Sequence, residues 1–165
     1  MKFTASTVCT VMDSPLGLIT LAASDQALVG VWFDAQAHFP DLAKWRTDDR
    51  HPLLQKTALQ LREYFAGRRR EFDIPLDLAG GTLFQREVWQ SLRTIAPGTT
   101  RTYGAIAASI QRTNAVRAVG GAIGRNPLSI IVPCHRVIGS SGSLTGYAGG
   151  LERKMALLRL EGALQ

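Results

Sequence analysis

The sequence predicts an α/β protein in two parts: a short antiparallel sheet with one helix, followed by a mostly α-helical part. Two observations carry this prediction. Short β-branched runs separated by turn residues fill the beginning of the chain, whereas apolar residues recur at helical spacing in several later segments. A linker over residues 76–81 lies between them, so we expect an N-terminal domain over 1–80 and a C-terminal domain over 81–165.

The segment from Phe3 to Phe33 predicts a three-stranded meander. It is rich in Val, Thr, Leu and Ile, and turn signals interrupt it at residues 14–17 and 24–26. Residues 34–51 are mixed and polar without a clear period, and we expect them to form a connection.

The segment from Leu54 to Phe65 predicts an amphipathic helix, because its apolar residues fall at i, i+4, i+7 and i+11. The helix should end at Gly67. The arginines at 68–70 follow directly, where they can interact with the helix dipole, remain solvated or contact nucleic acid.

The second part begins with Thr82 as the predicted N-cap of another helix. Its apolar positions repeat the same spacing at Phe84, Val88, Leu92 and Ile95. Two short helices are then predicted over Tyr103–Ile110 and Asn114–Gly124, with a three-residue turn between them. This is the pattern of a DNA-binding helix-turn-helix, although many small helical proteins share it.

The second of these short helices is rich in glycine. Each glycine lowers helix stability by roughly 1 kcal/mol relative to alanine. Close helix packing would explain them, and so would a smooth face that lies in a DNA groove with Arg117 projecting from it. The residues expected in its buried stripe are Ala115, Ala118, Val119 and Ala122, and those expected on the other face are Arg117, Gly120, Gly121 and Gly124.

The charge distribution favours an anionic partner for the second part. The net charge is +6, and residues 81–165 carry ten basic but only three acidic side chains, against nine and ten in residues 1–80. Cys9 and Cys134 are far apart and form no disulfide or metal-binding pattern, so we expect a cytoplasmic protein. We also expect no signal peptide and no membrane span.

The apolar run over residues 128–138 is interrupted by Pro133, Cys134, His135 and Arg136. A lone cysteine in such a run is ordinarily a core residue, but a neighbouring imidazole can take the thiol proton and lower its effective pKa below about 8.5. Adjacent side chains diverge in an extended chain, so we expect a bridging water between Cys134 and His135.

The last helix offers a third member for this site. Leu151, Met155 and Leu158 form its predicted apolar stripe, and Glu161 falls on the same face. A buried carboxylate needs a partner, and one that orients the imidazole would complete a Glu-His-water-Cys relay. The alternative is a carboxylate that is solvated where the helix frays.

At residues 133–137, Pro-Cys-His-Arg-Val, the sequence resembles the O6-alkylguanine-DNA alkyltransferases, also called methylated-DNA-protein-cysteine methyltransferases. Further motifs agree in family order over about residues 80–162, and the region before them fits the family layout. The resemblance implies a ribonuclease H-like N-terminal domain and a winged helix-turn-helix C-terminal domain. The agreeing motifs are Gly81-Thr82, Phe84-Gln85, Val88-Trp89, Tyr103-Gly104, Arg117-Ala118-Val119-Gly120, Asn126-Pro127, Gly146-Tyr147, Gly149-Gly150, Leu157-Leu158 and Glu161-Gly162.

The resemblance implies repair of DNA by direct reversal. An alkyl group would pass from O6-alkylguanine in duplex DNA irreversibly to Cys134, once per molecule and after base flipping, with O4-methylthymine as a candidate second substrate. The partner would be alkylated double-stranded DNA bound from the minor groove. We expect no cofactor, no metal, and a monomer that can cluster cooperatively on DNA.

The resemblance also implies roles for single residues. Cys134 would accept the alkyl group, His135 would be the water-mediated base, and Glu161 would orient it. Tyr103 would polarise guanine at N3, and Asn126 would brace the turn before the active site. The expected DNA contacts are Arg117, which fills the base stack, with Ala118, Gly120, Gly121, Thr102 and Arg136. The expected pocket is lined by Tyr103, Val137, Tyr147, Ala148, Gly149 and Lys154.

Three other functions compete with this one. A damage sensor that lacks the acceptor cysteine is disfavoured by Cys134. A cysteine hydrolase with the same Cys-His-Glu set is disfavoured by the Arg117 helix and the basic second half. A regulator that senses alkylation would need an additional methyl-accepting domain, for which this chain has no room.

Overall fold

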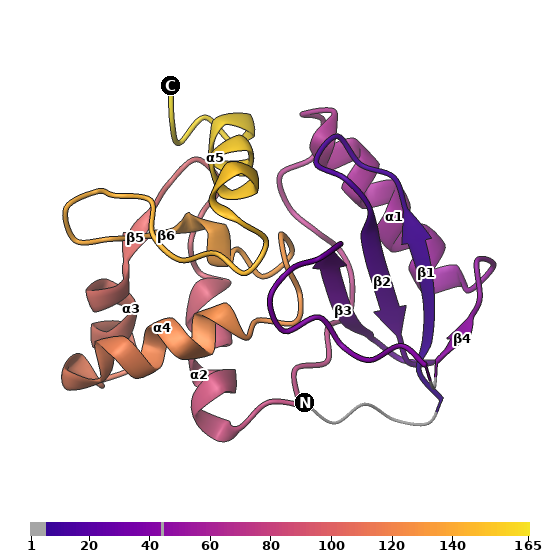
Figure 1. The fold of residues 1–165 in the computed structure, drawn as a ribbon, viewed down its shortest axis with the longest axis horizontal. Coiled ribbons are helices and arrows are strands. Elements are labelled where there is room, and N and C mark those ends of the chain that lie inside the picture. The colour runs from indigo at the N-terminus through magenta and orange to yellow at the C-terminus, as the bar shows by residue number, and fades with distance from the viewer. Residues whose placement is uncertain (1–5, 44) are drawn as a thin grey trace.

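The computed structural model describes residues 6–43 and 45–165, and the first residues of the predicted meander, including Phe3, lie outside them. The N-terminal sheet has the order β3-β2-β1-β4, with β1 to β3 antiparallel, which confirms the meander (Figure 1). A short strand that the sequence did not predict pairs parallel to β1. The strands are β1 (Val8–Met12), β2 (Ile19–Ala23), β3 (Leu28–Phe33) and β4 (Arg46–Thr47).

Helix α1 (Pro52–Phe65) confirms the first predicted helix. Its buried side chains, including Leu54 and Leu61, belong to the same hydrophobic cluster as the inner residues of the sheet. Trp32 packs on the other face of the sheet in a second cluster, with Phe39 and Trp45 against it. Every residue of β2 is buried because apolar groups cover the sheet on both faces.

Helix α2 (Leu83–Leu92) begins as predicted at Thr82. The Thr82 hydroxyl accepts from the Gln85 amide at 3.2 Å, and the Gln85 side chain accepts from the Thr82 amide at 2.9 Å. This reciprocal capping box satisfies two amides that the first turn would otherwise leave unpaired. The helix ends before Ile95, which is buried in the turn that follows.

The predicted helix pair is present as α3 (Tyr103–Ser109) and α4 (Val116–Gly124). A 3-10 turn, η1 (Thr113–Ala115), precedes α4, so the second helix starts later than predicted. Beside the pair, β5 (Arg101–Thr102) and β6 (Val137–Ile138) form a small parallel sheet. The expected buried stripe is wrong at Ala118, which is exposed, and at Ala115, which is half-buried and precedes α4. The buried residues of α4 are Val119, Ala122 and Ile123.

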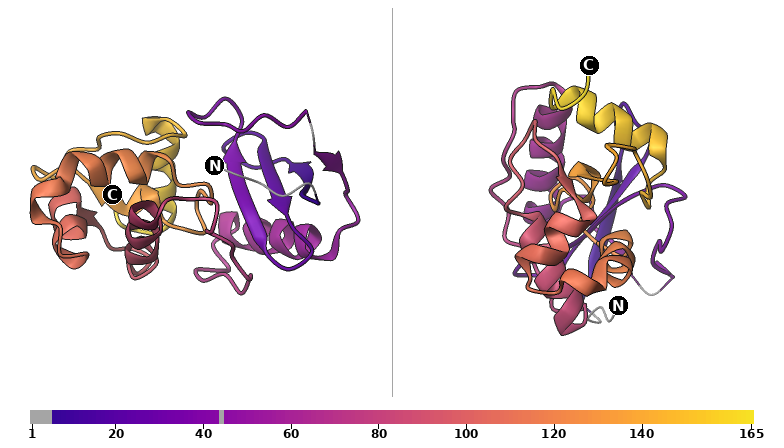
Figure 2. Two further views of the ribbon diagram at one scale, coloured as in Figure 1. Left: turned by 90° about the horizontal axis from the view of Figure 1, so that it is seen from below. Right: turned by 90° about the vertical axis from the view of Figure 1, so that its left-hand side faces the viewer.

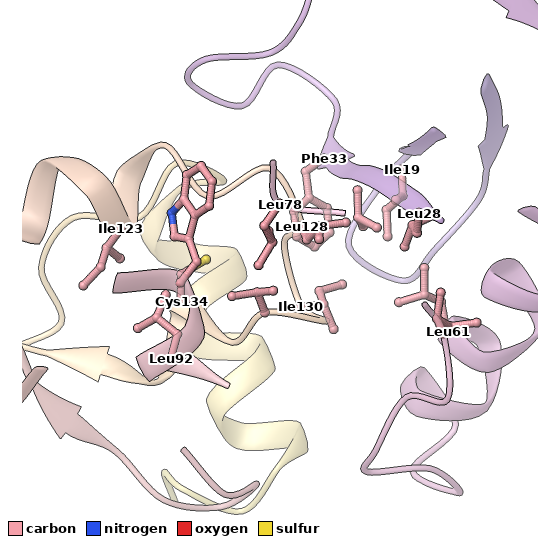
Figure 3. Close-up of a cluster of buried hydrophobic side chains, with 14 of the residues drawn as sticks. Ile19, Leu28, Phe33, Leu61, Leu78, Leu92, Ile123, Leu128, Ile130 and Cys134 are labelled. Carbon is pink, nitrogen blue, oxygen red and sulfur yellow. The ribbon is translucent and has the colours of Figure 1, made fainter. Parts of the chain in front are cut away.

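The chain ends with a further helix, α5 (Leu151–Leu160), in the helical part of the molecule. The sheet with α1 and the group of helices α2 to α5 lie side by side along the long axis (Figure 2). One hydrophobic core runs from the sheet to the helices, with Leu128 and Ile130 between the two and Cys134 in the helical part (Figure 3). No helix within residues 6–43 and 45–165 is both long enough and apolar enough to cross a membrane.

Candidate active site

The segment that carries Cys134 is attached to the edge of the N-terminal sheet. The amide of Val31 in β3 donates to Pro127 O at 2.8 Å, and the amide of Ser129 donates to Val31 O at 3.0 Å. The chain then forms the 3-10 turn η2 (Cys134–Arg136) before β6. The extended conformation assumed for Cys134 and His135 is therefore wrong, and both lie on a tight turn.

Cys134 is buried, with 4% of its surface exposed, and is held by Asn126. The Asn126 amide nitrogen lies 3.0 Å from Sγ of Cys134 and 2.8 Å from Val132 O, and its side-chain oxygen accepts from the Leu128 amide at 3.1 Å. Asn126 thus braces the turn, and it also contacts the sulfur, which the sequence did not indicate.

The resting form of Cys134 is the thiol. Burial raises the pKa of Cys134 above its ordinary value, although the hydrogen bond from Asn126 and the nearby charge of Lys154 act in the opposite direction. The prediction that the neighbouring imidazole lowers this pKa is therefore wrong.

His135 and Glu161 form the expected buried pair. Nε2 of the fully buried His135 lies 2.9 Å from Oε1 of Glu161, while Nδ1 has no hydrogen-bond partner among the described residues. Burial lowers the pKa of His135, and the bond to Glu161 only partly opposes this effect. The neutral imidazole that donates from Nε2 to a carboxylate carries its lone pair on Nδ1, so this atom can accept a proton.

Glu161 is held by Arg136 rather than solvated. Nε of Arg136 donates to Oε2 at 2.7 Å, and its NH2 group donates to Oε1 at 2.8 Å. Burial alone would raise the pKa of Glu161, but the hydrogen bonds from His135 and Arg136 lower it well below its ordinary value. The expected DNA contact of Arg136 is wrong, because its side chain is buried in this ion pair and also donates to Ile95 O.

The inward face of α5 differs from the predicted stripe. Leu151 is 46% exposed and Met155 is only partly buried. The buried residues of α5 are Lys154, Leu157 and Leu158, which lie on one face with Glu161 at spacings of i, i+3, i+4 and i+7.

Tyr103 and Lys154 meet at the loop before α5. The Tyr103 hydroxyl lies 3.0 Å from Thr145 O and 3.2 Å from Gly146 O. The fully buried Lys154 donates to Thr145 O at 2.7 Å, and burial lowers the pKa of Lys154 to about 8. Two residues of the expected pocket therefore share one carbonyl.

The rest of the expected pocket lies on the same loop and on β6. Val137 is fully buried, and Ala148 O accepts from the Ala37 amide at 2.9 Å. A Cβ atom at Gly149 would come within 2.8 Å of the Tyr147 ring and 3.1 Å of the Phe33 ring, so glycine is required there.

The other expected DNA contacts lie on the surface of the helix pair. Arg117, Ala118 and Gly121 are exposed, and Thr102 caps α3 by accepting from the Ala105 amide at 3.1 Å. A Cβ atom at Gly120 would lie 3.8 Å from the Tyr103 ring, an ordinary contact. One at Gly121 would lie 3.6 Å from the Arg125 side chain. Close helix packing therefore does not explain these glycines.

Sequence reasoning missed a fourth group in the buried cluster. The Tyr64 hydroxyl, from α1, donates to Oε1 of Glu161 at 2.7 Å. The available signal was its position on the inward face of α1, three residues after Leu61, where an aromatic residue with a polar tip needs a hydrogen-bond partner.

Comparisons with known proteins agree with this arrangement. Residues 7–78 match the model of the 6-O-methylguanine DNA methyltransferase ribonuclease-like domain, and residues 83–163 match that of its DNA binding domain. A methylated-DNA–protein-cysteine methyltransferase from Mycolicibacterium paratuberculosis is 51% identical over 150 residues, which cover 91% of this chain and 89% of the relative. One from Methanosarcina acetivorans is 46% identical, covering 93% and 97%.

A solved structure of Mycobacterium tuberculosis OGT in complex with DNA superposes with a TM-score of 0.87 at 48% sequence identity. The match covers 93% of this chain and 91% of that one. The chain therefore belongs to the 6-O-methylguanine DNA methyltransferase family.

Proposed function

We propose that this protein repairs DNA by moving an alkyl group from O6 of guanine in duplex DNA onto Cys134, where it stays. The observation that carries the proposal is the buried thiol of Cys134 beside a buried neutral His135 whose Nδ1 has no protein partner. The family supplies the substrate class, since its members are named for methylated DNA and a protein cysteine.

The reaction balances without a co-reactant. The Cys134 thiol proton passes to Nδ1 of His135 through a water molecule, and the imidazolium that forms is stabilised by Glu161. The sulfur attacks the alkyl carbon, and the bond from that carbon to O6 breaks with its electron pair leaving on the guanine. Guanine takes up a proton from water at N1, and the imidazolium of His135 returns the thiol proton to water, so the protons balance. The product is a thioether that no group in this site can cleave, so each molecule acts once.

Tyr103 would assist the leaving guanine by donating its hydroxyl to N3. For this, the hydroxyl must turn away from the carbonyls that it contacts at Thr145 and Gly146. Lys154 also donates to Thr145 O, so that carbonyl keeps a partner when Tyr103 turns. We propose this exchange as the role of Lys154 in the pocket.

Base flipping is a requirement of the chemistry, because in-line attack on the O6-alkyl group needs the nucleotide out of the stack. The glycine-rich face of α4, on which Gly121 is exposed and Gly120 and Gly124 are half-buried, offers a smooth surface for the minor groove. The exposed Arg117 lies on the same helix. We propose that Arg117 fills the space that the flipped base leaves.

We place the boundary between scaffold and acceptor domain near residue 80. The N-terminal part then holds the active-site turn through β3, and the C-terminal part carries the groups that act on DNA. We also place the protein in the cytoplasm, where a reducing environment keeps the free thiol of Cys134 available.

Intact-protein mass tests the transfer directly. Mixing the protein with a duplex containing O6-methylguanine should add a single methyl group of about 14 Da, never more than one per molecule. Cys134→Ala and an unmodified duplex should show no addition. A duplex with O4-methylthymine tests the second substrate in the same assay. Tight binding to the lesion without a mass change would leave a damage-binding protein as the function.

Duplex affinity tests the role of α4. Arg117→Ala should weaken binding of an O6-methylguanine duplex by about tenfold, measured by fluorescence anisotropy at fixed salt. Arg50→Ala removes the same charge from an exposed position in the N-terminal part, outside the arginine run at 68–70, and serves as the matched control. Equal losses in both variants would mean that only net charge matters.

A further inference from the structure

Tyr64 lies far from Glu161 in the sequence, yet its hydroxyl is built into the buried cluster around this carboxylate. Its side chain is 2% exposed, and its hydroxyl donates to Oε1 of Glu161 at 2.7 Å. The rings of Phe65 and Phe72 pack against the Tyr64 ring, each with a centroid distance of 5.5 Å. The hydroxyl is therefore fixed in place by the aromatic packing of the N-terminal part.

The oxygen that Tyr64 contacts is the one that holds His135. Oε1 of Glu161 is approached by the Tyr64 hydroxyl at 2.7 Å, Arg136 at 2.8 Å and His135 Nε2 at 2.9 Å. Oε2 is bonded only by Arg136, at 2.7 Å, among the contacts that the structure describes. Each donor withdraws electron density from Oε1, so the tyrosine weakens the pull of this oxygen on the His135 proton.

We propose that Tyr64 is a positioning residue for alkyl transfer, whose hydroxyl fixes Oε1 of Glu161 and limits the basicity of His135. This inference rests on the proposed function insofar as His135 is the proton acceptor there. It gives the N-terminal part a role in the chemistry besides that of a scaffold.

Other charged and titratable groups act on the same imidazole. Glu161 favours the protonated form of His135, whereas the positive charges of Arg136 from η2 and Lys154 from α5 disfavour it. Tyr147, on the loop before α5, is half-buried near Cys134, and desolvation raises its pKa well above its ordinary value. Burial and the charge of Glu161 raise the pKa of Tyr64 far above its ordinary value, so Tyr64 remains a neutral donor.

The test is the pH profile of single-turnover methyl transfer by the full chain carrying Tyr64→Phe. Removing the hydroxyl should strengthen the pull of Glu161 on the His135 proton and so raise the pKa of His135. The acidic limb of the profile, where the transfer rate falls because His135 becomes protonated, should then move to higher pH by about half a unit or more. A ring-fluorinated tyrosine at position 64 is a stronger donor and should move the limb to lower pH. An unshifted limb in both proteins would overturn the proposal, even if the rate fell at every pH.

Leu54→Ala is the matched control, because it removes buried packing from α1 and keeps the Tyr64 hydroxyl and the rings that hold it. It should lower stability and leave the limb in place. NMR titration of the His135 imidazole in a Cys134→Ala background, with and without Tyr64→Phe, measures the same pKa without any alkyl transfer. If the protein without substitutions transfers no methyl group, only the proposed function is refuted. If the pKa of His135 is the same with and without Tyr64→Phe, the role of Tyr64 is refuted.

Discussion

The carboxylate of Glu161 joins a tyrosine, a histidine and an arginine in the interior of the protein. Its side chain and that of His135 are both almost fully buried. Arg136 bonds both carboxylate oxygens and supplies the positive charge that compensates the carboxylate. Removing one member of such a pair leaves an uncompensated charge in a medium of low dielectric constant.

We therefore expect Arg136→Met to lower the free energy of unfolding by about 3–5 kcal/mol, measured by urea denaturation. The double variant Arg136→Met with Glu161→Gln removes both charges and should recover part of that loss. A double variant no more stable than the single one would show that the arginine acts through packing and not through charge.

On the proposed mechanism, we expect the pH dependence of transfer to follow the titration of His135. Because burial depresses the pKa of His135, its neutral form persists below the ordinary histidine value of about 6.5. The transfer rate should therefore stay level as the pH falls through that value and decline only below it. His135→Gln should be slow at every pH and lack this limb. An acidic limb at or above about 6.5 would contradict the burial argument.

At the scale of elements, helix α4 combines low helix propensity with a glycine-rich face that is at least partly exposed. Gly121 is exposed, and a Cβ atom there would make only an ordinary contact with Arg125. Glycine lowers the stability of such a helix and gains no packing in return. The proposed close approach of this surface to a DNA backbone would explain its presence.

Gly121→Ala should accordingly raise the free energy of unfolding by about 0.5–1 kcal/mol and weaken binding to duplex DNA. Thermal unfolding and anisotropy titration of the same preparation measure both effects. Loss of stability would favour the packing explanation instead. Unchanged DNA affinity would mean that this face does not contact the groove.

At the scale of the whole molecule, Arg153 joins α5 to the N-terminal part. Its guanidinium donates to Leu16 O at 2.9 Å, to Asp34 O at 3.1 Å and to Gly149 O at 3.1 Å. It also lies 4.9 Å from the centre of the Phe33 ring. One side chain thus connects the turns of the sheet with the loop that carries the expected pocket.

Arg153→Met should lower stability by about 1–2 kcal/mol, since three carbonyls lose a charged donor at a partly exposed site. It should also slow methyl transfer, because the loop at Gly149 loses its anchor. Arg159→Met on the same helix is the matched control and should change stability by no more than about 0.5 kcal/mol. Equal effects of both variants would remove the proposed role of Arg153.

Apolar spacing, turn residues and capping residues in the sequence were sufficient to predict the meander, α1, the capped start of α2 and the helix pair. Each depends on interactions between residues close in sequence, such as the Thr82 capping box. Local patterns were not sufficient for β4, which has two residues and exists only because β1 lies beside it. The stripe of α5 was mispredicted because Lys154, a charged residue, occupies a buried position.

The sequence by itself determined the order of elements, the basic second half, and the Cys134, His135 and Glu161 set. Only the tertiary structure decided which groups hold that set, and it placed Arg136 in the interior and Tyr64 against Glu161. The physical reason is that burial and hydrogen-bond partners depend on elements that meet across the fold. Spacing along the chain carries no information about a donor 97 residues away.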